Sequence, residues 1–574
     1  MTDGTARVGS PDWHSFHLFL HCDTGQTDAF LTDDLAPLLD QWVAAREAAA
    51  WFFVRYGEDG PHLRVRVRAL GAAAAGELPV ALARLAKERP GVDGSWPSSH
   101  AEVRAVPYVP ETDRYGGPRA LPLAEGVFAA STRTAIEVLR QLPRGTDRLT
   151  TAADLVHTTA HALGLDRLGA AQWLRRHAAG WRWTTEVALL PGELVHTKVN
   201  TVYARQHQAL VERARALRVG LERRTAAPWL SDWAEQVRAA DRSLREAVAG
   251  PDPDGADAEP RRLWVWGSQL HMLLNRLGVT PDEERAVCRL AARTLLDAGE
   301  PPSFFPTGHR APDRQYLERS KFQVGRNADS AVRPLPPPPP RPAAGGHPGR
   351  PEITLPAGPL PDVSLQAALT GRTSARGPLG GPLTAAGLGA LLWGSHADSH
   401  RSEQRLADGG TRTLNHRPYP SAGALYTVRL RLIALDVAGL PAGTYQCLPQ
   451  RRALSVIGPA PSVAEVKPLS SYFSRSSDDP DWIGVDRLPV LLGLYLDLGL
   501  LRRRYGLRAL RLGLLEAGHL AQTLLLNATA LGLATTTLGG FHDDLAHELF
   551  GLDDLDQPLQ YLLPLGRRAP AQRT

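Results

Sequence analysis

A proline run near the middle of the chain constrains the fold more than any other feature. The segment NADSAVRPLPPPPPRPAAGGHPGRPE occupies residues 327–352. Proline donates no backbone hydrogen bond, so such a run favours an extended spacer over a helix or a strand. At 574 residues the chain is also too long for one hydrophobic core. We therefore predict domains at 13–326 and 361–574, joined by a linker at 327–360; a partner-recruiting proline motif is the alternative to a plain spacer.

The composition is that of an ordinary globular protein, with 43% hydrophobic and 22% charged residues. A net charge of +5 spread over 574 residues produces only a weak electrostatic field, and no block of Lys and Arg forms a basic tail. We therefore expect no direct nucleic-acid partner. The three cysteines, Cys22, Cys288 and Cys447, include no CxxC pair, and no apolar run is long enough to cross a bilayer. We expect a cytoplasmic protein without a membrane segment, a disulfide framework or a structural zinc site.

Both domains combine strand-like and helix-like patterns. Before the linker, SFHLFLHC, AWFFVRY, HLRVRVR and AEVRAVPYV predict strands, and the pattern turns helical from about residue 125 to 300. After the linker, VRLRLIALDV and VLLGLYLDL predict strands, whereas SLQAALTGRTS and TAAGLGALLWGS predict helices. A long helix is predicted at ALRLGLLEAGHLAQTLLLNATALGL; it is apolar nearly all round, which indicates burial between a sheet and another subunit. The predicted fold class is α+β for both domains.

The run HLRVRVR predicts a strand with one cationic face. Strict alternation places Leu63, Val65 and Val67 on one face and His62, Arg64, Arg66 and Arg68 on the other. Like charges side by side on a strand repel each other, so this face predicts an anion lying across it.

Two further clusters accompany this strand. YVPETDRYGGP at 108–118 places Glu111 and Arg114 before two glycines, in a turn where backbone can approach a ligand closely. GSQLHMLLNRLGV at 267–279 predicts a helix on which His271 and Asn275 share a face with Leu274. Taken singly, each cluster is also compatible with an ordinary surface arginine, loop or core histidine.

Together and in this order, the three motifs resemble the elimination domain of class I lanthipeptide and thiopeptide dehydratases, from about residue 13 to 325. In that family a separate domain or protein transfers glutamate from glutamyl-tRNA to a Ser or Thr hydroxyl of a peptide. The elimination domain then expels glutamate and leaves dehydroalanine or dehydrobutyrine. The resemblance implies that Arg64, Arg66 and Arg114 bind the glutamyl group and that His271 is the acid/base group, whichever proton it moves.

This chemistry accounts for the predicted anion. The conjugate acid of a carboxylate leaving group has a pKa of roughly 3.5, whereas water, the conjugate acid of hydroxide, has a pKa of about 15.7. Glutamate is therefore a far better leaving group than hydroxide. Two alternatives remain for the first domain. One is the related formation of a pyridine ring from two dehydroalanines, which has no glutamate to hold; the other is a non-catalytic peptide-binding module. The helical trio Asp154, His157 and His161 is spaced like metal ligands but matches no known metal motif, so we expect a structural role and no metal.

The second domain resembles the nitroreductase-fold flavoenzymes, specifically the SagB-type azoline dehydrogenases. The motifs that carry the resemblance are RPYPSAGALYTVRLRLIAL, EAGHLAQTLLLNATALGLATTTLGGF and LPLGRRAP. It implies FMN as the cofactor and a homodimer that binds FMN across its interface. The residues implied to contact the phosphate and ribityl chain are Arg372, Ser374 and Arg376, with Arg567 or Arg568 adding charge. Those implied to lie against the flavin ring are Pro420, Ser421, Ala422, Gly423, Gly539 and Gly540.

The implied reaction oxidises a thiazoline or oxazoline of a peptide to the aromatic azole. The family's proposed catalytic pair is Lys-Tyr, but here the positions are Arg504 and Tyr505. Arginine cannot deprotonate in a protein, so Arg504 is not a base. It can favour the phenolate of Tyr505 and make that residue the base, or the pair can simply position substrate; both interpretations stay open.

The fusion resembles the bifunctional elimination and azoline-oxidation enzymes of lactazole-type thiopeptide pathways. This resemblance implies a ribosomal precursor peptide as substrate, with a separate glutamyl-tRNA-dependent glutamylation protein and a cyclodehydratase as partners. A generic flavin nitroreductase fused to a domain of unrelated use is the remaining alternative.

Overall fold

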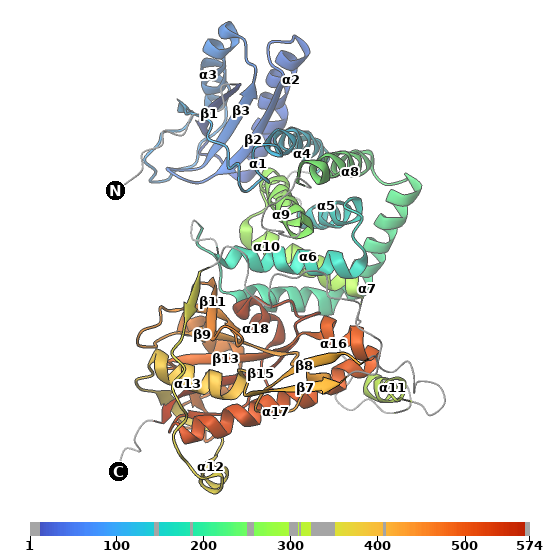
Figure 1. Ribbon diagram of the computed structural model, residues 1–574. Coiled ribbons are helices and arrows are strands. Elements are labelled where there is room, and N and C mark those ends of the chain that lie inside the picture. The colour runs from blue at the N-terminus through green and yellow to red at the C-terminus, as the bar shows by residue number, and fades with distance from the viewer. Residues whose placement is uncertain are drawn as a thin grey trace. The chain divides into compact units, whose positions relative to one another are not determined.

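The computed structural model describes residues 12–142, 148–183, 187–248, 258–297, 308, 311–322, 351–405 and 409–568. The predicted linker at 327–360 therefore lies outside the described residues up to residue 350. The chain forms two compact units (Figure 1): Met1–Leu189 with Thr197–Glu300, and Leu190–His196 with Pro301–Thr574. The described part of 301–322 thus belongs to the second unit, while the predicted domain boundaries stay predictions.

The first unit contains a four-stranded antiparallel sheet with the order β2-β3-β1-β4. Its strands are β1 (Trp13–Phe19), β2 (Ala50–Tyr56), β3 (His62–Arg68) and β4 (Val103–Ala105). The alternation predicted for HLRVRVR is confirmed, because Leu63, Val65 and Val67 are at most 1% exposed and pack in the core, whereas the arginines of β3 are only partly covered. The opposite face of β3 carries the cationic stripe.

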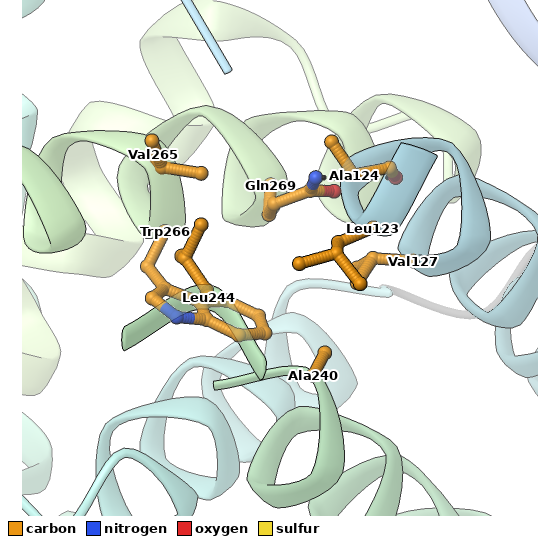
Figure 2. A pocket seen from close by; sticks show the side chains of 8 residues that line it. All are labelled: Leu123, Ala124, Val127, Ala240, Leu244, Val265, Trp266 and Gln269. Atoms are coloured by element: carbon orange, nitrogen blue, oxygen red, sulfur yellow. Dashed lines mark hydrogen bonds between the residues drawn. The ribbon is translucent and has the colours of Figure 1, made fainter. Parts of the chain in front are cut away.

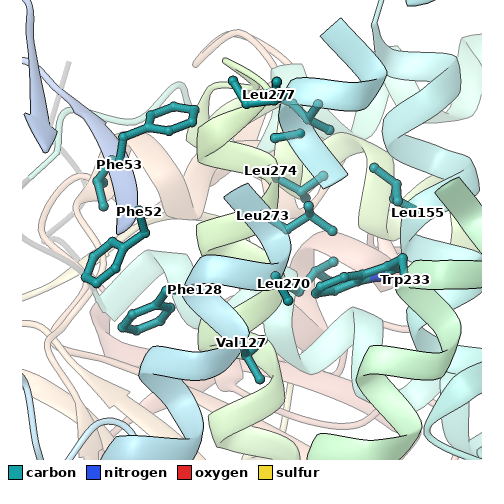
Figure 3. Packing of buried hydrophobic residues seen from close by; sticks show 14 of the residues in the cluster. Phe52, Phe53, Val127, Phe128, Leu155, Trp233, Leu270, Leu273, Leu274 and Leu277 are labelled. Atoms are coloured by element: carbon teal, nitrogen blue, oxygen red, sulfur yellow. The ribbon is translucent and has the colours of Figure 1, made fainter. Parts of the chain in front are cut away.

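Helices form the rest of the first unit. They are α1 (Thr24–Ala29), η1 (Phe30–Leu35), α2 (Ala36–Ala44), α3 (Ala72–Lys87), α4 (Leu121–Gln141), α5 (Leu149–Ala162), α6 (Arg167–Gly180), η2 (Trp181–Trp183), α7 (Gly192–Arg223), α8 (Pro228–Val248), α9 (Ala258–Arg276) and α10 (Pro281–Leu296). The helical pattern predicted from 125 to 300 is confirmed for the residues of this range that the structure describes. Leu270, Leu273 and Leu274 of α9, and Leu277 directly after it, belong to the hydrophobic core (Figure 3).

A charged network fixes the C-terminal end of α9 on strand β2. The Arg55 Nε atom donates to the carbonyl oxygen of Arg276 at 3.0 Å, and the Asn275 side chain bonds both backbone groups of Arg55 at 2.9 Å. Asp28 accepts from Arg55 at 2.6 Å and from Arg148 at 2.8 Å. Cations at a helix C-terminus complement the helix dipole, so this network holds α9 in a defined register against the sheet.

The second unit is built on a nine-stranded sheet with the order β12-β6-β15-β13-β9-β10-β11-β5, and β14 pairs with β15. Its strands are β5 (Glu352–Thr354), β6 (Gly377–Gly380), β9 (Val428–Ala434), β10 (Gly443–Leu448), β11 (Ala453–Gly458), β12 (Ile483–Gly484), β13 (Val490–Leu496), β14 (Ala534–Thr535) and β15 (Leu559–Arg568), with a separate hairpin of β7 (His400–Arg405) and β8 (Thr411–His416). Buried residues pack on both faces of the sheet: Leu492 belongs to one core and Leu491 to the other.

The helices of the second unit are α11 (Pro312–Arg319), α12 (Leu365–Gly371), α13 (Ala385–His396), η3 (Ala422–Ala424), α14 (Val463–Val466), η4 (Lys467–Leu469), α15 (Ser471–Ser474), α16 (Leu498–Tyr505), η5 (Gly506–Arg508), α17 (Ala509–Ala530) and α18 (Asp543–Phe550). The strands and helices predicted after the linker are confirmed, and both units are α+β. Helix α17 buries one face, yet Leu514 is 46% and Leu515 61% exposed. Within the described residues, no helix is long and apolar enough to cross a membrane.

Candidate active sites

Arg64 lies on the cationic stripe of the first unit but is already engaged. On this face His17 of β1 pairs with Arg64 of β3, and Ser15 pairs with Arg66. The Arg64 guanidinium lies 3.4 Å from the centroid of the Tyr56 ring, and its Nη2 atom contacts Glu58 at 3.2 Å. A stacked and paired guanidinium has less capacity for a further anion than an unpaired one.

Arg66 has no carboxylate partner among the described residues. Its guanidinium lies beside two neighbouring aromatic rings, 5.6 Å from the centroid of Phe52 and 4.9 Å from that of Tyr108. The buried Nε atom makes no hydrogen bond, and burial lowers the pKa of Arg66. A buried, unpaired donor is costly, so Arg66 is available for an anion.

Arg114 reaches the same region from the predicted turn. Gly116 and Gly117 have φ values of 90° and 93°, which favour glycine. The Arg114 Nη1 atom contacts Glu111 at 2.8 Å, and its Nε atom donates to Ser268 Oγ on α9 at 3.2 Å. Ser268 stands three residues before His271 on the same helix, so Arg114 contacts α9 about one helical turn before the predicted acid/base group.

His271 is held by a buried carboxylate. Its Nδ1 atom lies 2.8 Å from Glu284, which is 0% exposed and also accepts from His177 at 2.6 Å and from Trp181 at 3.1 Å. Although burial opposes ionisation, the charge of His271 and the hydrogen bond from His177 hold the pKa of Glu284 well below its usual value. A proton on Nδ1 facing the carboxylate leaves Nε2 as the atom for proton transfer.

Sequence reasoning missed Ser268, Glu284 and His177. Glu284 had a detectable signal, because it stands in register with Val287 and Cys288 on the buried face of α10, where apolar residues are expected. A carboxylate at such a position requires buried partners. The partners themselves come from distant segments and have no local signature.

Asp154, His157 and His161 form the trio for which we expect a structural role. Asp154 accepts two hydrogen bonds from Arg213, at 2.8 and 2.6 Å, and burial lowers the pKa of His157 to about 4. Among the described residues, no group of histidine, cysteine and carboxylate side chains is arranged to hold a metal ion.

A small apolar pocket also lies in the first unit, between α4, α8 and α9 (Figure 2). It is lined by Leu123, Ala124, Val127, Ala240, Leu244, Val265, Trp266 and Gln269. The lining has no ionisable side chain, so this pocket cannot bind a carboxylate by charge.

In the second unit, the residues predicted to contact a phosphate converge where β6 pairs with β15. Arg567 of β15 pairs with Gly380 of β6. The exposed Arg568 donates from Nη2 to the hydroxyl of Thr373 at 2.6 Å. Thr373 is the residue between Arg372 and Ser374 in the chain. The backbone amide of Ala375 donates to Thr535 at 3.1 Å and fixes the loop that holds Ser374 and Arg376.

Arg376 and Gly540 both lie near the ring of Tyr472. The Arg376 guanidinium is 5.8 Å from the centroid of Tyr472 and contacts Asp481 at 3.1 Å. A Cβ atom added at Gly540 would lie 3.7 Å from Tyr472, and the Gly540 carbonyl accepts from Ser470 at 2.6 Å. The exposed pair with Asp481 is weak, so it leaves Arg376 able to bind another anion.

The PSAG loop meets Tyr505. Gly423 has a φ of 60°, and a Cβ atom added there would lie 2.5 Å from the Tyr505 hydroxyl. Ser421 donates to Glu516 at 2.6 Å and accepts from the Tyr426 amide at 2.8 Å. Glu516, which sequence reasoning missed, is 1% exposed and also accepts from the Val428 amide at 2.8 Å. The structure therefore brings Tyr505, a predicted catalytic residue, to the PSAG loop, which is predicted to bind the cofactor. Arg504, the residue before Tyr505, is half-buried.

These two clusters contact opposite parts of α17. The PSAG loop bonds Glu516, whereas Gly371, next to Arg372, lies against Thr529. Thirteen residues separate the two positions in the chain, which is about 20 Å along a helix axis.

Helix α11, which lies before the linker, contacts the segment after Tyr505. The Tyr316 hydroxyl donates to the Leu507 carbonyl at 3.2 Å and accepts from the Arg511 amide at 3.0 Å. Arg511 is the third residue of α17, whose own N-cap makes no side-chain hydrogen bond. Tyr316 thus takes the place of a capping side chain for α17.

Comparison with known proteins gives two family matches. Residues 13–295 match the lantibiotic biosynthesis dehydratase C-terminal family, and residues 370–567 match the nitroreductase family. The microcin B17-processing protein McbC of Escherichia coli is 31% identical over 141 residues, which are 24% of this chain and 49% of that protein. The chain thus spans about half the length of this relative.

Two solved structures resemble parts of the chain more distantly. The pyridine synthase TbtD from thiomuracin biosynthesis is 23% identical with a TM-score of 0.42, over 50% of this chain and 98% of its own. The tRNA-dependent lantibiotic dehydratase MibB from Microbispora sp. 107891 is 22% identical with a TM-score of 0.38, over 52% of this chain and 29% of its own. Similarities this low do not bear on the choice of reaction.

Proposed function

We propose, from a chain that joins a lantibiotic dehydratase C-terminal domain to a nitroreductase domain, that one protein modifies a ribosomally made precursor peptide in two ways. The first unit eliminates glutamate from glutamylated Ser or Thr and leaves dehydroalanine or dehydrobutyrine. The second unit oxidises peptide azolines to azoles with FMN. The observations that support the first activity are the contact of Arg114 with Ser268, one turn before His271 on α9, and the lack of a carboxylate partner for Arg66 among the described residues.

The elimination breaks two bonds of the acylated residue and forms one. A base removes the α-proton of the acylated residue, a carbon–carbon double bond forms, and the bond from the β-carbon to the ester oxygen breaks, so that glutamate departs as a carboxylate. Arg66 and Arg114 bind that carboxylate with charge-assisted hydrogen bonds. His271 moves a proton at Nε2, because Glu284 holds its other nitrogen.

The pyridine-forming alternative explains this arrangement less well. Joining two dehydroalanines releases no glutamate, so it requires no guanidinium kept free of carboxylates. Arg66, which has no carboxylate partner among the described residues, therefore favours elimination over ring formation.

A synthetic peptide that carries one O-glutamyl serine tests the first activity with the full chain. We expect mass spectrometry to find dehydroalanine and one free glutamate per site. An intact ester that still binds the protein would instead identify the first unit as a peptide-binding module.

The second unit has the groups that an FMN site requires. Arg372, Arg567 and Arg568 supply positive charge near Ser374 for the phosphate, and the small residues of the PSAG loop leave room for a flat ring. When bound, FMN supplies the acceptor for the hydride that leaves the azoline. Tyr505, at the PSAG loop, would accept the proton that leaves the azoline together with this hydride, or would orient the substrate.

A homodimer fits the separation of the two clusters. The predicted phosphate-binding cluster lies against one part of α17, and the PSAG loop lies about 20 Å away along the helix. In a homodimer, the phosphate-binding cluster of one subunit could face the PSAG loop of the other. The exposed side chains of Leu514 and Leu515 on α17 supply apolar area for such an interface.

An azoline-containing peptide tests the second activity. We expect the FMN-loaded chain to remove two hydrogens per azoline without added NAD(P)H, and Tyr505→Phe to slow this reaction. Reduction of nitroaromatic compounds with NAD(P)H, without azoline oxidation, would identify a generic nitroreductase. The proposal also requires a separate glutamylation protein and a cyclodehydratase to supply the two substrates.

A further inference from the structure

Helix α9 carries two buried arginines whose surroundings differ. Arg262 is 2% exposed and contacts two carboxylates, Asp241 at 2.6 Å and Glu259 through its Nε atom at 2.9 Å. Although burial opposes it, hydrogen bonds to these carboxylates raise the pKa of Arg262. This is the usual way in which a protein accommodates a buried cation.

Arg276, at the other end of α9, is 0% exposed and pairs with no carboxylate among the described residues. Its Nη1 atom donates to Ser131 at 3.1 Å, while Nε and Nη2 make no hydrogen bond. Burial lowers the pKa of Arg276 to about 9, so it remains charged at neutral pH. A buried guanidinium with two unpaired nitrogens destabilises a fold.

Arg276 and Arg66 share an aromatic support. Their guanidinium carbons lie 5.8 and 5.6 Å from the centroid of the Phe52 ring, and Arg276 is also 5.4 Å from the centroid of Phe128. Figure 3 shows Phe52 and Phe128 side by side in this region. Two neighbouring cations, each with a buried unpaired nitrogen, repel each other unless an anion lies close to both.

We infer that Arg276 is a positioning residue of the glutamate-binding site, and that its charge is compensated by the carboxylate held by Arg66. This inference rests on the proposed elimination. Because Arg276 is fully buried, it acts through the field at Arg66 rather than by touching the substrate. It strengthens carboxylate binding where water has little access.

The test compares Arg276→Met with Arg262→Met in the full chain. A methionine keeps the contact with the aromatic rings and removes the unpaired charge, so we expect R276M to raise the melting temperature by roughly 2–4 °C. R262M leaves Asp241 and Glu259 without their cation, so we expect it to lower the melting temperature.

The elimination activity of R276M is expected to fall although its melting temperature rises. R276M should slow glutamate elimination from the O-glutamyl serine peptide by about tenfold or more, and free L-glutamate should raise its melting temperature less than that of the wild type. Arg276→Lys keeps the charge and should retain more elimination activity than R276M. A structural role would not combine higher stability with lower activity.

Two results would overturn the inference: a melting temperature of R276M below that of the wild type, or elimination by R276M at the wild-type rate. Failure of the proposed function has a different signature, because the wild type itself would leave the peptide ester intact. The stability change and the response to L-glutamate would still report on the cation pair in that case.

Discussion

In the first unit Arg114 contacts α9 one turn before His271, whereas the predicted cofactor groups of the second unit contact opposite parts of α17. The first site is assembled by one chain, from a sheet, a turn and a helix. The second site is divided into a phosphate cluster and a ring-binding loop. Positive charge held in place by the fold is ready before the ligand arrives, whereas the proposed FMN site requires the cofactor and, under our proposal, a second subunit to bring its two clusters together.

Replacement of His271 should produce the largest difference between the two activities. In His271→Ala the proton carrier is lost, so elimination should fall by about 10²–10⁴-fold, while azoline oxidation by the same protein stays unchanged. Mass spectrometry of both peptides measures both activities. His161→Ala, on α5, is the matched control. Normal dehydroalanine formation by His271→Ala would remove the histidine from the mechanism.

Gly423→Ala should break the second site and spare the first. The new Cβ atom would lie 2.5 Å from the Tyr505 hydroxyl in backbone with a φ of 60°, so loop or tyrosine must move. We expect azoline oxidation to fall about tenfold or more, since a displacement of about 1 Å is costly in an active site. Gly518→Ala, where a Cβ atom meets nothing within 4 Å, is the control. Equal rates for the two variants would contradict the assigned contact.

Arg66 and Arg64 offer a sharper comparison within the first site. Arg64 is paired with Glu58 and stacked on Tyr56, whereas Arg66 has no carboxylate partner among the described residues. We expect Arg66→Met to reduce elimination about tenfold more than Arg64→Met. The measurement is kcat/KM for the O-glutamyl serine peptide. A larger loss for Arg64→Met would place the carboxylate elsewhere on the stripe.

Tyr316→Phe should weaken the second unit by a small amount. It removes the hydroxyl that caps α17, which is worth about 1 kcal/mol. Chemical denaturation monitored with peptide-level hydrogen exchange should find earlier opening near Arg511, with the first unit unaffected. Leu317→Ala, an exposed neighbour at 49%, is the control. Unchanged exchange at Arg511 would show that the hydroxyl has no capping role.

The smallest effect concerns pH. Burial, aided by the charges of Arg64 and neighbouring groups, lowers the pKa of His17 from 6.5 to about 4. The unfolded chain therefore takes up a proton as pH falls through 6.5, while folded His17 resists until about pH 4, so stability falls across this window. His17→Gln should flatten the decline in melting temperature between these pH values. An unchanged slope would assign it to other groups.

Local patterns predicted much of the fold, and less of the chemistry. Alternation in HLRVRVR gave the buried face of β3 correctly, because strand geometry depends on adjacent residues. The difference between Arg64 and Arg66 depends on Glu58 and Tyr108, whose positions follow from tertiary packing. Spacing likewise could not reveal that Glu284 holds His271, since a loop and the first turn of α10 separate them.

The second unit repeats this lesson. The PSAG loop and Tyr505 were predicted separately, and their contact at Gly423 spans 82 positions of the chain. The role of Tyr316 could not be predicted, because a capping group normally lies next to its helix in sequence. The domain boundary at 326 stays a prediction, since residues 323–350 lie outside the described part of the chain.

The most direct measurement is the mass of a peptide with one O-glutamyl serine after incubation with the full chain. Elimination converts the residue to dehydroalanine, whereas ester hydrolysis returns serine, which is heavier by one water. We predict dehydroalanine from the wild type and the intact ester from Arg66→Met and His271→Ala. Serine, or an intact ester from the wild type, would contradict the claim that these guanidinium groups stabilise a departing glutamate.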